Sequence, residues 1–449
     1  MDTKHAILMA KSRTISPADG RMYANLLAHE RLSPPDLAEL QRVRGARLAT
    51  YAWDTTDFYR DHYSSAGLSR QDVADPEAFE HLPTVEKEHL RDGSARFHAR
   101  DVAQRDTKMA STGGSTGEPV RLLHDRRVPV RTISWRLLRW WGVEASDDVA
   151  HVYRHVRSPR REILHTLQWW PSRSIQIDAY RMDSAALETF FRRFRRVRPR
   201  LVLGYVGGIY ELACHIEEHG IALPPVAAVG VTAAPLSEVQ RSTIERVFGA
   251  PAFDHYRCGE VPWIAGECGA HRGLHSFGDV RLVEVVDDGG RRLPAGVIGD
   301  TVVTDLTNRA FPLVRYRLGD RSAMIATPCP CGVTLPLMEH VRGRVSDALH
   351  LPDGQIVAGE GLTAIFDDWP EAVRAFQVYQ HADASISLRY VVGSDPRAEE
   401  IVAHVRDVVR SMVRDKVPVA TELVDSIPHD GGKTRYIVSE LRSVAPVRA

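Results

Sequence analysis

The segment Met109-Ala-Ser-Thr-Gly-Gly-Ser-Thr-Gly-Glu-Pro-Val120 is the most informative stretch of this sequence. It places three glycines and four hydroxyl residues within the nine positions 111–119. Glycines let backbone N–H groups approach an anion closely, and serine and threonine add hydroxyl donors. The segment is not a Walker loop, because Gly117 is followed by Glu118 instead of by Lys and Ser or Thr. Its residues alone leave two interpretations open, a phosphate-binding loop and a flexible surface loop.

The bulk properties predict a soluble cytoplasmic protein with two or three domains. The chain has 449 residues, which exceeds the usual size of a single domain. Lys+Arg and Asp+Glu both total 58, so no net charge attracts nucleic acid or an anionic membrane. No apolar run reaches membrane length, and the five cysteines do not predict a disulfide framework. We therefore expect neither nucleic acid nor a membrane as a partner.

The order of the predicted elements indicates an α/β fold. Residues 1–100 are rich in helix-forming side chains. Buried strands are predicted at 201–205 and 226–232, and helices at 184–198, 207–220 and 237–248. Ser237 is the expected N-cap of the last helix, Gln240 its capping-box partner and Gly249 its end. Strands that alternate with helices favour a mostly parallel sheet with both faces covered.

Two later regions have a different pattern. Residues 280–306 predict antiparallel strands around the turn Asp287-Asp-Gly-Gly290, which together form a β-subdomain. Beyond residue 346, two strands at 375–379 and 385–392 and a helix with one apolar face predict a small α+β domain. We therefore expect a large N-terminal domain of residues 1–345 and a C-terminal domain of residues 346–449.

A polar cluster, Asp254-His-Tyr-Arg-Cys-Gly-Glu260, follows the mainly apolar residues 248–253 as it would at the end of a strand. Ligands of open α/β sheets gather at the carboxyl ends of strands. A carboxylate such as that of Glu260 suits Mg²⁺, which prefers hard oxygen ligands together with substrate phosphates.

Three of the cysteines form a separate constellation with histidine. Cys329-Pro-Cys331-Gly332 is a tight knuckle, and Cys268-Gly-Ala-His271-Arg-Gly-Leu-His275 supplies one thiol and two imidazoles. A tetrahedral Cys₃His zinc site needs such a set. The residues alone leave open whether these are zinc ligands or unrelated cytosolic thiols, and which histidine would bind.

Five motifs, in order, resemble those of the adenylate-forming superfamily of acyl-CoA ligases, adenylation domains and luciferases. The closest resemblance is to its phenylacetate-CoA-ligase-like and CapK-like branch. The motifs are residues 109–120, residues 254–260, Phe311-Pro-Leu-Val-Arg-Tyr-Arg-Leu-Gly-Asp320, Arg342-Gly-Arg-Val-Ser-Asp347 and His429-Asp-Gly-Gly-Lys-Thr-Arg-Tyr436. Two weaker matches precede them, Phe58-Tyr-Arg60 and Leu82-Pro-Thr-Val-Glu-Lys87.

The resemblance implies how these motifs bind and activate ATP. Tyr256 would stack on adenine, Asp320 would accept both ribose hydroxyls, and Glu260 would hold Mg²⁺. Lys433 would stabilise the negative charge that builds on the α-phosphate. The implied catalytic residues are Lys433, Glu260 and Thr116. The implied nucleotide contacts are Ser111, Gly113, Gly114, Ser115, Thr116, Gly117, Thr232, Ala233, Ala234, Tyr256, Asp320 and Arg344.

The resemblance also implies a hinge and a structural metal site. Asp347 would be the pivot about which a mobile C-terminal domain turns. Many members of the branch have cysteines and a histidine at the corresponding places, which we interpret as a structural Zn²⁺ site. Its ligands would be Cys268, His275, Cys329 and Cys331, with His275 favoured over His271 because it occupies the Gly-Leu-His position.

These matches predict an AMP-forming acid–CoA ligase. A small aromatic carboxylic acid would react with Mg·ATP to give an acyl-adenylate, and the acyl group would pass to the thiol of coenzyme A or of a carrier-protein phosphopantetheine. One alternative is adenylation of an amino acid or nitrite with transfer to an amine. Another is a catalytically degenerate nucleotide-binding protein, motivated by departures from the family pattern at Glu118, Ala234 and Arg257. A homodimer is left open.

Overall fold

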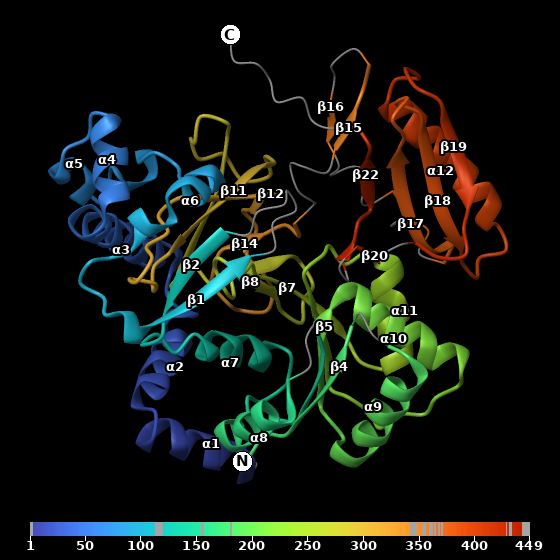
Figure 1. Cartoon of the computed structure of the whole chain (residues 1–449), viewed down its shortest axis with the longest axis horizontal. Coiled ribbons are helices and arrows are strands. Elements are labelled where there is room, and N and C mark those ends of the chain that lie inside the picture. Colours follow the sequence, from blue (N-terminus) through green and yellow to red (C-terminus); the bar gives the residue numbers. More distant parts are fainter. Residues whose placement is uncertain are drawn as a thin grey trace. The chain divides into compact units, whose positions relative to one another are not determined.

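The computed structural model describes residues 3–112, 120–153, 157–179, 182–341, 348–352, 356–358, 362, 365–366, 369, 371–427, 429–430 and 433–441. The chain folds into two compact units, each built from two stretches of sequence. Unit 1 comprises Met1–Ser146 with Phe253–Val341, and unit 2 comprises Asp147–Ala252 with Arg342–Ala449. Figure 1 colours their elements along the sequence.

Unit 1 begins with helices whose starts are set by local capping. Ser33 accepts a hydrogen bond from the Asp36 N–H before a proline-initiated helix, and Ser69 forms a capping box with Asp72. The helices of unit 1 are α1 (Thr3–Thr14), α2 (Pro17–His29), α3 (Pro34–Thr55), α4 (Asp57–Ser65), α5 (Arg70–Ala74), α6 (Lys87–Gly93) and α7 (Arg131–Trp140), with 3₁₀ turns η1 (Phe79–His81), η2 (Ser94–Phe97) and η3 (Gln104–Asp106).

The strands of unit 1 pair in antiparallel fashion. A hairpin joins β1 (Thr107–Thr112) to β2 (Val120–Asp125). The predicted β-subdomain is present as the sheet of β10 (Arg281–Val286), β11 (Gly299–Asp305) and β12 (Tyr316–Ser322). A further set runs in the order β13 (Met324–Ile325), β14 (Leu337–Met338), β9 (Leu274–Ser276), β8 (Ala265–Glu267) and β7 (Ala252–Tyr256).

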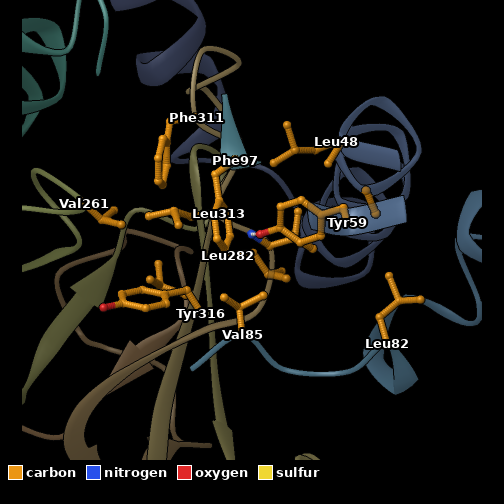
Figure 2. Packing of buried hydrophobic residues seen from close by; sticks show 14 of the residues in the cluster. Leu48, Tyr59, Leu82, Val85, Phe97, Val261, Leu282, Phe311, Leu313 and Tyr316 are labelled. Atoms are coloured by element: carbon orange, nitrogen blue, oxygen red, sulfur yellow. Dashed lines mark hydrogen bonds between the residues drawn. The ribbon is translucent and has the colours of Figure 1, made fainter. Parts of the chain in front are cut away.

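An aromatic core connects the helices of unit 1 to the strand β12 (Figure 2). Phe97 stacks on Phe311 with ring centroids 5.2 Å apart. Tyr59 is fully buried, and its hydroxyl accepts from the Val314 N–H at 2.8 Å and donates to the Pro312 carbonyl at 3.2 Å. The residues before β12 are therefore fixed by both packing and satisfied polar groups.

Unit 2 contains the predicted parallel sheet, in the strand order β6-β5-β3-β4. Its strands are β3 (Val149–Tyr153), β4 (Ser174–Asp178), β5 (Leu201–Tyr205) and β6 (Ala228–Thr232). Gly204 is required in β5, because a Cβ there would lie 2.2 Å from the Val152 carbonyl oxygen. The helices are α8 (Pro159–Trp169), α9 (Ser184–Val197), α10 (Val206–Glu218) and α11 (Glu238–Phe248).

The C-terminal part of unit 2 has the predicted α+β composition (Figure 1). Four strands, in the order β19-β18-β17-β22, form a mixed sheet against which α12 (Ala398–Met412) packs. The strands of this part are β15 (Ala348–His350), β16 (Ile356–Ala358), β17 (Val373–Gln380), β18 (Ile386–Val392), β19 (Val419–Leu423), β20 (His429–Asp430), β21 (Lys433–Thr434) and β22 (Ile437–Ser439).

The predicted fold class is therefore confirmed, a mixed α/β protein with a separate C-terminal α+β part. The capping of α11 is also as expected, because Ser237 and Gln240 form the capping box and Gly249 ends the helix with φ +61°. The spacing of Val408 places it on the apolar face that was predicted for the helix α12, but it is 39 % exposed. In the described part of the chain, no helix combines the length and the apolar character needed to cross a membrane.

Candidate active site

The hairpin β1–β2 frames the predicted phosphate-binding segment. Thr112 of β1 pairs with Val120 of β2, so the two strands deliver the backbone to either end of residues 113–119. Gly113, Gly114, Ser115, Thr116 and Gly117 lie outside the described residues, as does the side chain of Ser111. Their assignment to phosphate binding therefore stays a prediction.

Strand β2 is tied to two loops of unit 1. The Asn308 amide donates to the Leu123 carbonyl at 2.9 Å and its side-chain oxygen accepts from the Asp125 N–H at 3.2 Å. One residue earlier, the His124 Nε2 atom lies 3.1 Å from the Gly259 carbonyl oxygen, next to Glu260. The β1–β2 hairpin and the loop that carries Glu260 are thus directly connected.

Two of the predicted nucleotide contacts touch each other. The Tyr256 hydroxyl donates a hydrogen bond of 2.6 Å to Oδ2 of Asp320, across 64 residues of sequence. The distance is typical of an O–H group that donates to a carboxylate. Asp320 is only 8 % exposed, so the hydrogen bond also offsets part of the cost of burying its charge. The adenine-stacking and ribose-binding residues of the prediction therefore form one structural pair.

A bulge in β12 presents Asp320. Asp300 of β11 pairs with Arg321, whereas Val302 pairs with Arg317, so residues 318–320 stand opposite Thr301 alone. Gly319 has φ +78°, a left-handed conformation that favours glycine. Such bulges bend a strand and redirect a side chain. The motif has glycine before Asp320 because the backbone is left-handed there, and this bulge directs the Asp320 side chain toward Tyr256.

Glu260 lies in a second buried group beside β12. Its Oε1 atom accepts from the Tyr316 hydroxyl at 3.4 Å and is 3.9 Å from the ammonium nitrogen of Lys87. Burial, and then the charge of Glu260, raises the pKa of Tyr316 far above its ordinary value, so the hydroxyl remains a donor. Burial and the same carboxylate also raise the pKa of the Cys258 thiol. The Glu260 side chain therefore lies beside a lysine ammonium group and a tyrosine hydroxyl, and its carboxylate oxygens are ligands of the kind that Mg²⁺ prefers.

Lys87 reaches Glu260 because the segment before α6 is bound to β12. The Val85 N–H donates to the Arg315 carbonyl, and the Arg317 N–H donates to the Val85 carbonyl, both at 2.9 Å. The buried Arg315 guanidinium adds a hydrogen bond to the Leu82 carbonyl and an ion pair with Glu284 at 3.1 Å. Lys87 is the first residue of α6 and so follows this anchored stretch directly.

No role was predicted from the sequence for Lys87 or Tyr316. Both residues lie within quoted family-like motifs, at the end of Leu82-Pro-Thr-Val-Glu-Lys87 and in the middle of Phe311–Asp320. The signal that could have indicated a role for Lys87 was the position of a charged residue at the end of a family-like motif. Its partner could not be read from spacing, because Lys87 and Glu260 are far apart in the sequence.

The predicted adenine segment lies in unit 2, at the carboxyl end of β6. Thr232 is the last residue of that strand and is 2 % exposed. Ala233 follows with φ +79°, so the backbone turns sharply there, and Ala234 precedes the start of α11. This is the position at which open α/β sheets bind ligands.

Three other predicted residues are not described in full. Arg344 and the hinge residue Asp347 lie outside the described part of the chain. Lys433 has its backbone in β21, where it pairs with Asp430, and its side chain is outside the description. Their roles stay predictions.

The four predicted zinc ligands come together in unit 1. One ligand atom from each of Cys268, His275, Cys329 and Cys331 lies within 4.8 Å of the others. The sulfur atoms of Cys268 and Cys329 are 3.5 Å apart, and the Cys331 sulfur is 3.3 Å from Nε2 of His275. Zinc–sulfur bonds of about 2.3 Å in a tetrahedron put ligand atoms roughly 3.8 Å apart, so the cluster has close to the size of a zinc site.

The surroundings of the cluster orient its ligands. His275 Nδ1 lies 3.0 Å from the Leu335 carbonyl, so a proton there leaves Nε2 free to bind a metal. The Val333 N–H donates to the Cys331 sulfur at 3.4 Å. His271 points elsewhere, with Nδ1 3.5 Å from Glu267. The geometry therefore favours His275 over His271 as the fourth ligand.

Without a cation, the surroundings of the cluster favour neutral thiols over thiolates. Burial, together with hydrogen bonds from the other cysteines, raises the pKa of Cys268 to about 12. Burial likewise raises the pKa of Cys331 and lowers that of His275. A Zn²⁺ ion would reverse this preference for the thiols, because it binds them as thiolates.

Comparisons with known proteins agree with this fold over nearly the whole chain. Residues 349–440 match the family described as the CapK C-terminal domain. The phenylacetate-coenzyme A ligase of Thermus thermophilus is 24 % identical over 446 residues, covering 91 % of this chain and 98 % of that protein. Protein CapK of Staphylococcus aureus is 22 % identical, covering 91 % of this chain and 90 % of that protein.

A solved structure has the same architecture. The crystal structure of 2-hydroxyisobutyryl-CoA ligase in the postadenylation state, in complex with 2-HIB-AMP, has a TM-score of 0.74 at 19 % identity. The match covers 92 % of this chain and 91 % of the chain of that ligase. Together with the sequence relatives, this identifies the chain as an adenylate-forming ligase of the AMP-producing class. Within that class, the chain is similar to phenylacetate-coenzyme A ligases and to CapK.

Proposed function

We propose that this protein activates a small aromatic carboxylic acid with ATP and transfers the acyl group to coenzyme A. The observation that supports this most directly is a set of four residues in unit 1, the pair of Tyr256 with the buried Asp320 and the pair of the buried Glu260 with Lys87. It combines a carboxylate for ribose, an aromatic ring for adenine, a carboxylate for Mg²⁺ and a cation for phosphate.

The first half-reaction joins the acid to AMP. A carboxylate oxygen of the acid forms a bond to the α-phosphorus of ATP, and the bond from that phosphorus to the bridging oxygen breaks. Pyrophosphate leaves with the bonding electrons, and the acyl-adenylate remains. Negative charge accumulates on the phosphate oxygens during this displacement, so fixed positive groups accelerate it.

Glu260 would hold Mg²⁺, which would screen the phosphate charges when ATP is bound. Lys87 would supply a fixed positive charge on the same side, for the phosphates that leave. Lys433 would act at the α-phosphate, carried there by the C-terminal domain of residues 346–449. Asp347 would be the pivot that later turns this domain away.

The second half-reaction passes the acyl group from the adenylate to sulfur. The thiolate of coenzyme A attacks the acyl carbon, the bond from that carbon to the phosphate oxygen breaks, and AMP leaves. A carrier-protein phosphopantetheine presents the same thiol and is the alternative acceptor.

The Zn²⁺ site of Cys268, His275, Cys329 and Cys331 is proposed to be structural. Four protein ligands close the coordination shell, as in structural zinc sites. The ion would contribute folding free energy to unit 1 and take no part in adenylation.

ATP–pyrophosphate exchange across a panel of aromatic, hydroxy, amino and branched acids tests the proposal. We expect exchange that depends on one class of aromatic acid, and AMP release with thioester formation when coenzyme A is added. Exchange with no acid in the panel would refute the ligase function. Exchange driven by amino acids or nitrite alone would replace the aromatic acid by one of those alternatives.

A further inference from the structure

Tyr436 joins the segment that carries Lys433 to helix α11. It lies three residues after Lys433, and its hydroxyl donates a hydrogen bond of 2.7 Å to Oε1 of Gln240. Both side chains are buried, at 6 % and 5 % exposure. The two residues are 196 positions apart and lie in the same compact unit. Leaving one of two buried polar partners unpaired is costly.

The backbone of Tyr436 belongs to the C-terminal sheet. Its carbonyl accepts from the Val378 N–H at 2.7 Å, and the neighbouring Arg435 carbonyl accepts from the Gln377 amide at 2.9 Å. The Tyr436 ring packs on Phe376, with centroids 5.0 Å apart. The residue is therefore fixed in the sheet, and its hydroxyl reaches α11.

Gln240 is equally well fixed on its own side. It is the capping-box residue of α11, and its Oε1 atom also accepts from the Ser237 N–H at 3.3 Å. The helix follows the turn at Ala233 and Ala234, the predicted adenine segment. The hydrogen bond therefore connects the stretch after the predicted catalytic lysine to the helix after the predicted adenine contacts.

Other contacts join the same parts of unit 2. Val239 of α11 packs into the hydrophobic cluster that includes Phe376 and Tyr436. The Tyr210 hydroxyl donates to the Arg374 carbonyl, and exposed ion pairs join Arg374 to Glu218 at 3.2 Å and Arg246 to Glu371 at 3.7 Å. Exposed ion pairs contribute little, whereas the Tyr436–Gln240 hydrogen bond joins two buried side chains and fixes their direction.

We infer that Tyr436 and Gln240 are positioning residues for the adenylation half-reaction, an inference that rests on the proposed function. Their hydrogen bond sets the place of the Lys433 segment relative to the predicted adenine segment. The charge of Lys433 is needed while negative charge builds at the α-phosphate and not when sulfur attacks the acyl carbon. The hydrogen bond should therefore matter for adenylate formation and not for thioester formation.

Tyr436→Phe tests this inference with the smallest possible change, since the ring and its contact with Phe376 remain. We expect kcat for ATP–pyrophosphate exchange, with the best acid of the panel, to fall about ten-fold. The KM for ATP should stay within about two-fold, because no ATP contact is removed. The rate of thioester formation from prepared acyl-adenylate and coenzyme A should also stay within about two-fold.

Two further variants complete the design. Tyr379→Phe is the matched control, because the Tyr379 hydroxyl bonds Glu440 within the same C-terminal part. It should leave both half-reactions unchanged. Gln240→Leu removes the acceptor, and the double variant with Tyr436→Phe should exchange no more slowly than the slower single variant, as expected for two partners of one hydrogen bond.

The outcomes separate this inference from the proposed function. An active wild type with an unchanged exchange rate in Tyr436→Phe would overturn the inference and leave the function intact. Equal losses in both half-reactions, with a lower melting temperature, would show a merely structural role and also overturn it. A wild type that exchanges with no acid would refute the function itself.

Discussion

Replacing Asp320 by alanine tests whether this chain has a working nucleotide site. The side chain is 8 % exposed and already accepts the Tyr256 hydroxyl at 2.6 Å. If the carboxylate also accepts both ribose hydroxyls, it makes two charge-assisted hydrogen bonds to ATP, each contributing about 1.5–3 kcal/mol. Because Tyr256 occupies part of its acceptor capacity, we take the lower end of this range, about 3 kcal/mol in total.

A loss of about 3 kcal/mol corresponds to an increase of roughly a hundred-fold in the Kd for ATP. Asp320→Asn should lie between wild type and alanine, because an amide keeps one acceptor oxygen without the charge. The affinity for the acid should change far less, since the acid meets the α-phosphate and not the ribose. Asp287→Asn, on a turn of the same unit where it pairs with Arg291, is a control for the loss of one carboxylate.

Calorimetric titration with ATP and with 2′,3′-dideoxy-ATP measures the effect directly. Wild type should bind the dideoxy nucleotide much more weakly than ATP, whereas Asp320→Ala should bind the two with nearly equal Kd. Equal discrimination by both proteins would show that Asp320 does not bind the ribose. A melting temperature close to that of wild type would confirm that the variant is folded.

Lys433→Ala should lower the exchange rate about a hundred-fold or more while ATP still binds, as measured by exchange and calorimetry; near wild-type exchange would remove Lys433 from the mechanism. Lys87→Met should raise the KM for pyrophosphate in the exchange reaction about ten-fold, and an unchanged KM would show that its charge serves Glu260 alone. Metal analysis should find about one Zn²⁺ per chain, lost together with thermal stability in Cys329→Ser or Cys331→Ser and retained in Cys214→Ser, which lies outside the cluster. Metal-free protein of full stability would contradict the zinc site.

The features that could be predicted from the sequence are those that depend on neighbouring residues. One example is the helix α11. Its capping box of Ser237 and Gln240 and its end at Gly249 depend only on nearby residues, and the structure has them as predicted. The apolar periodicity of the strands and helices likewise predicted the parallel sheet and the C-terminal α+β part. The motifs indicated which residue types carry the chemistry, because each motif is contiguous.

The contacts that assemble the candidate site depend on tertiary structure. Tyr256 meets Asp320 only because β12 bulges at Gly319, and a register shift between β11 and β12 leaves no trace in spacing. Lys87 meets Glu260 because residues 82–87 are bound along β12.

The choice of the zinc-binding histidine and the partner of Tyr436 also depend on tertiary structure. The residues alone left both His271 and His275 open as zinc ligands, and the family resemblance favoured His275. In the structure β9, which pairs with β14, brings His275 to the cysteines, whereas His271 lies beside Glu267. Nothing in the sequence around Tyr436 indicates that Gln240 is its partner, and Gln240 is recognisable there only as a capping residue. Hydrogen bonds over such separations are set by how the chain folds back on itself, whereas sequence patterns report on residues a few positions apart.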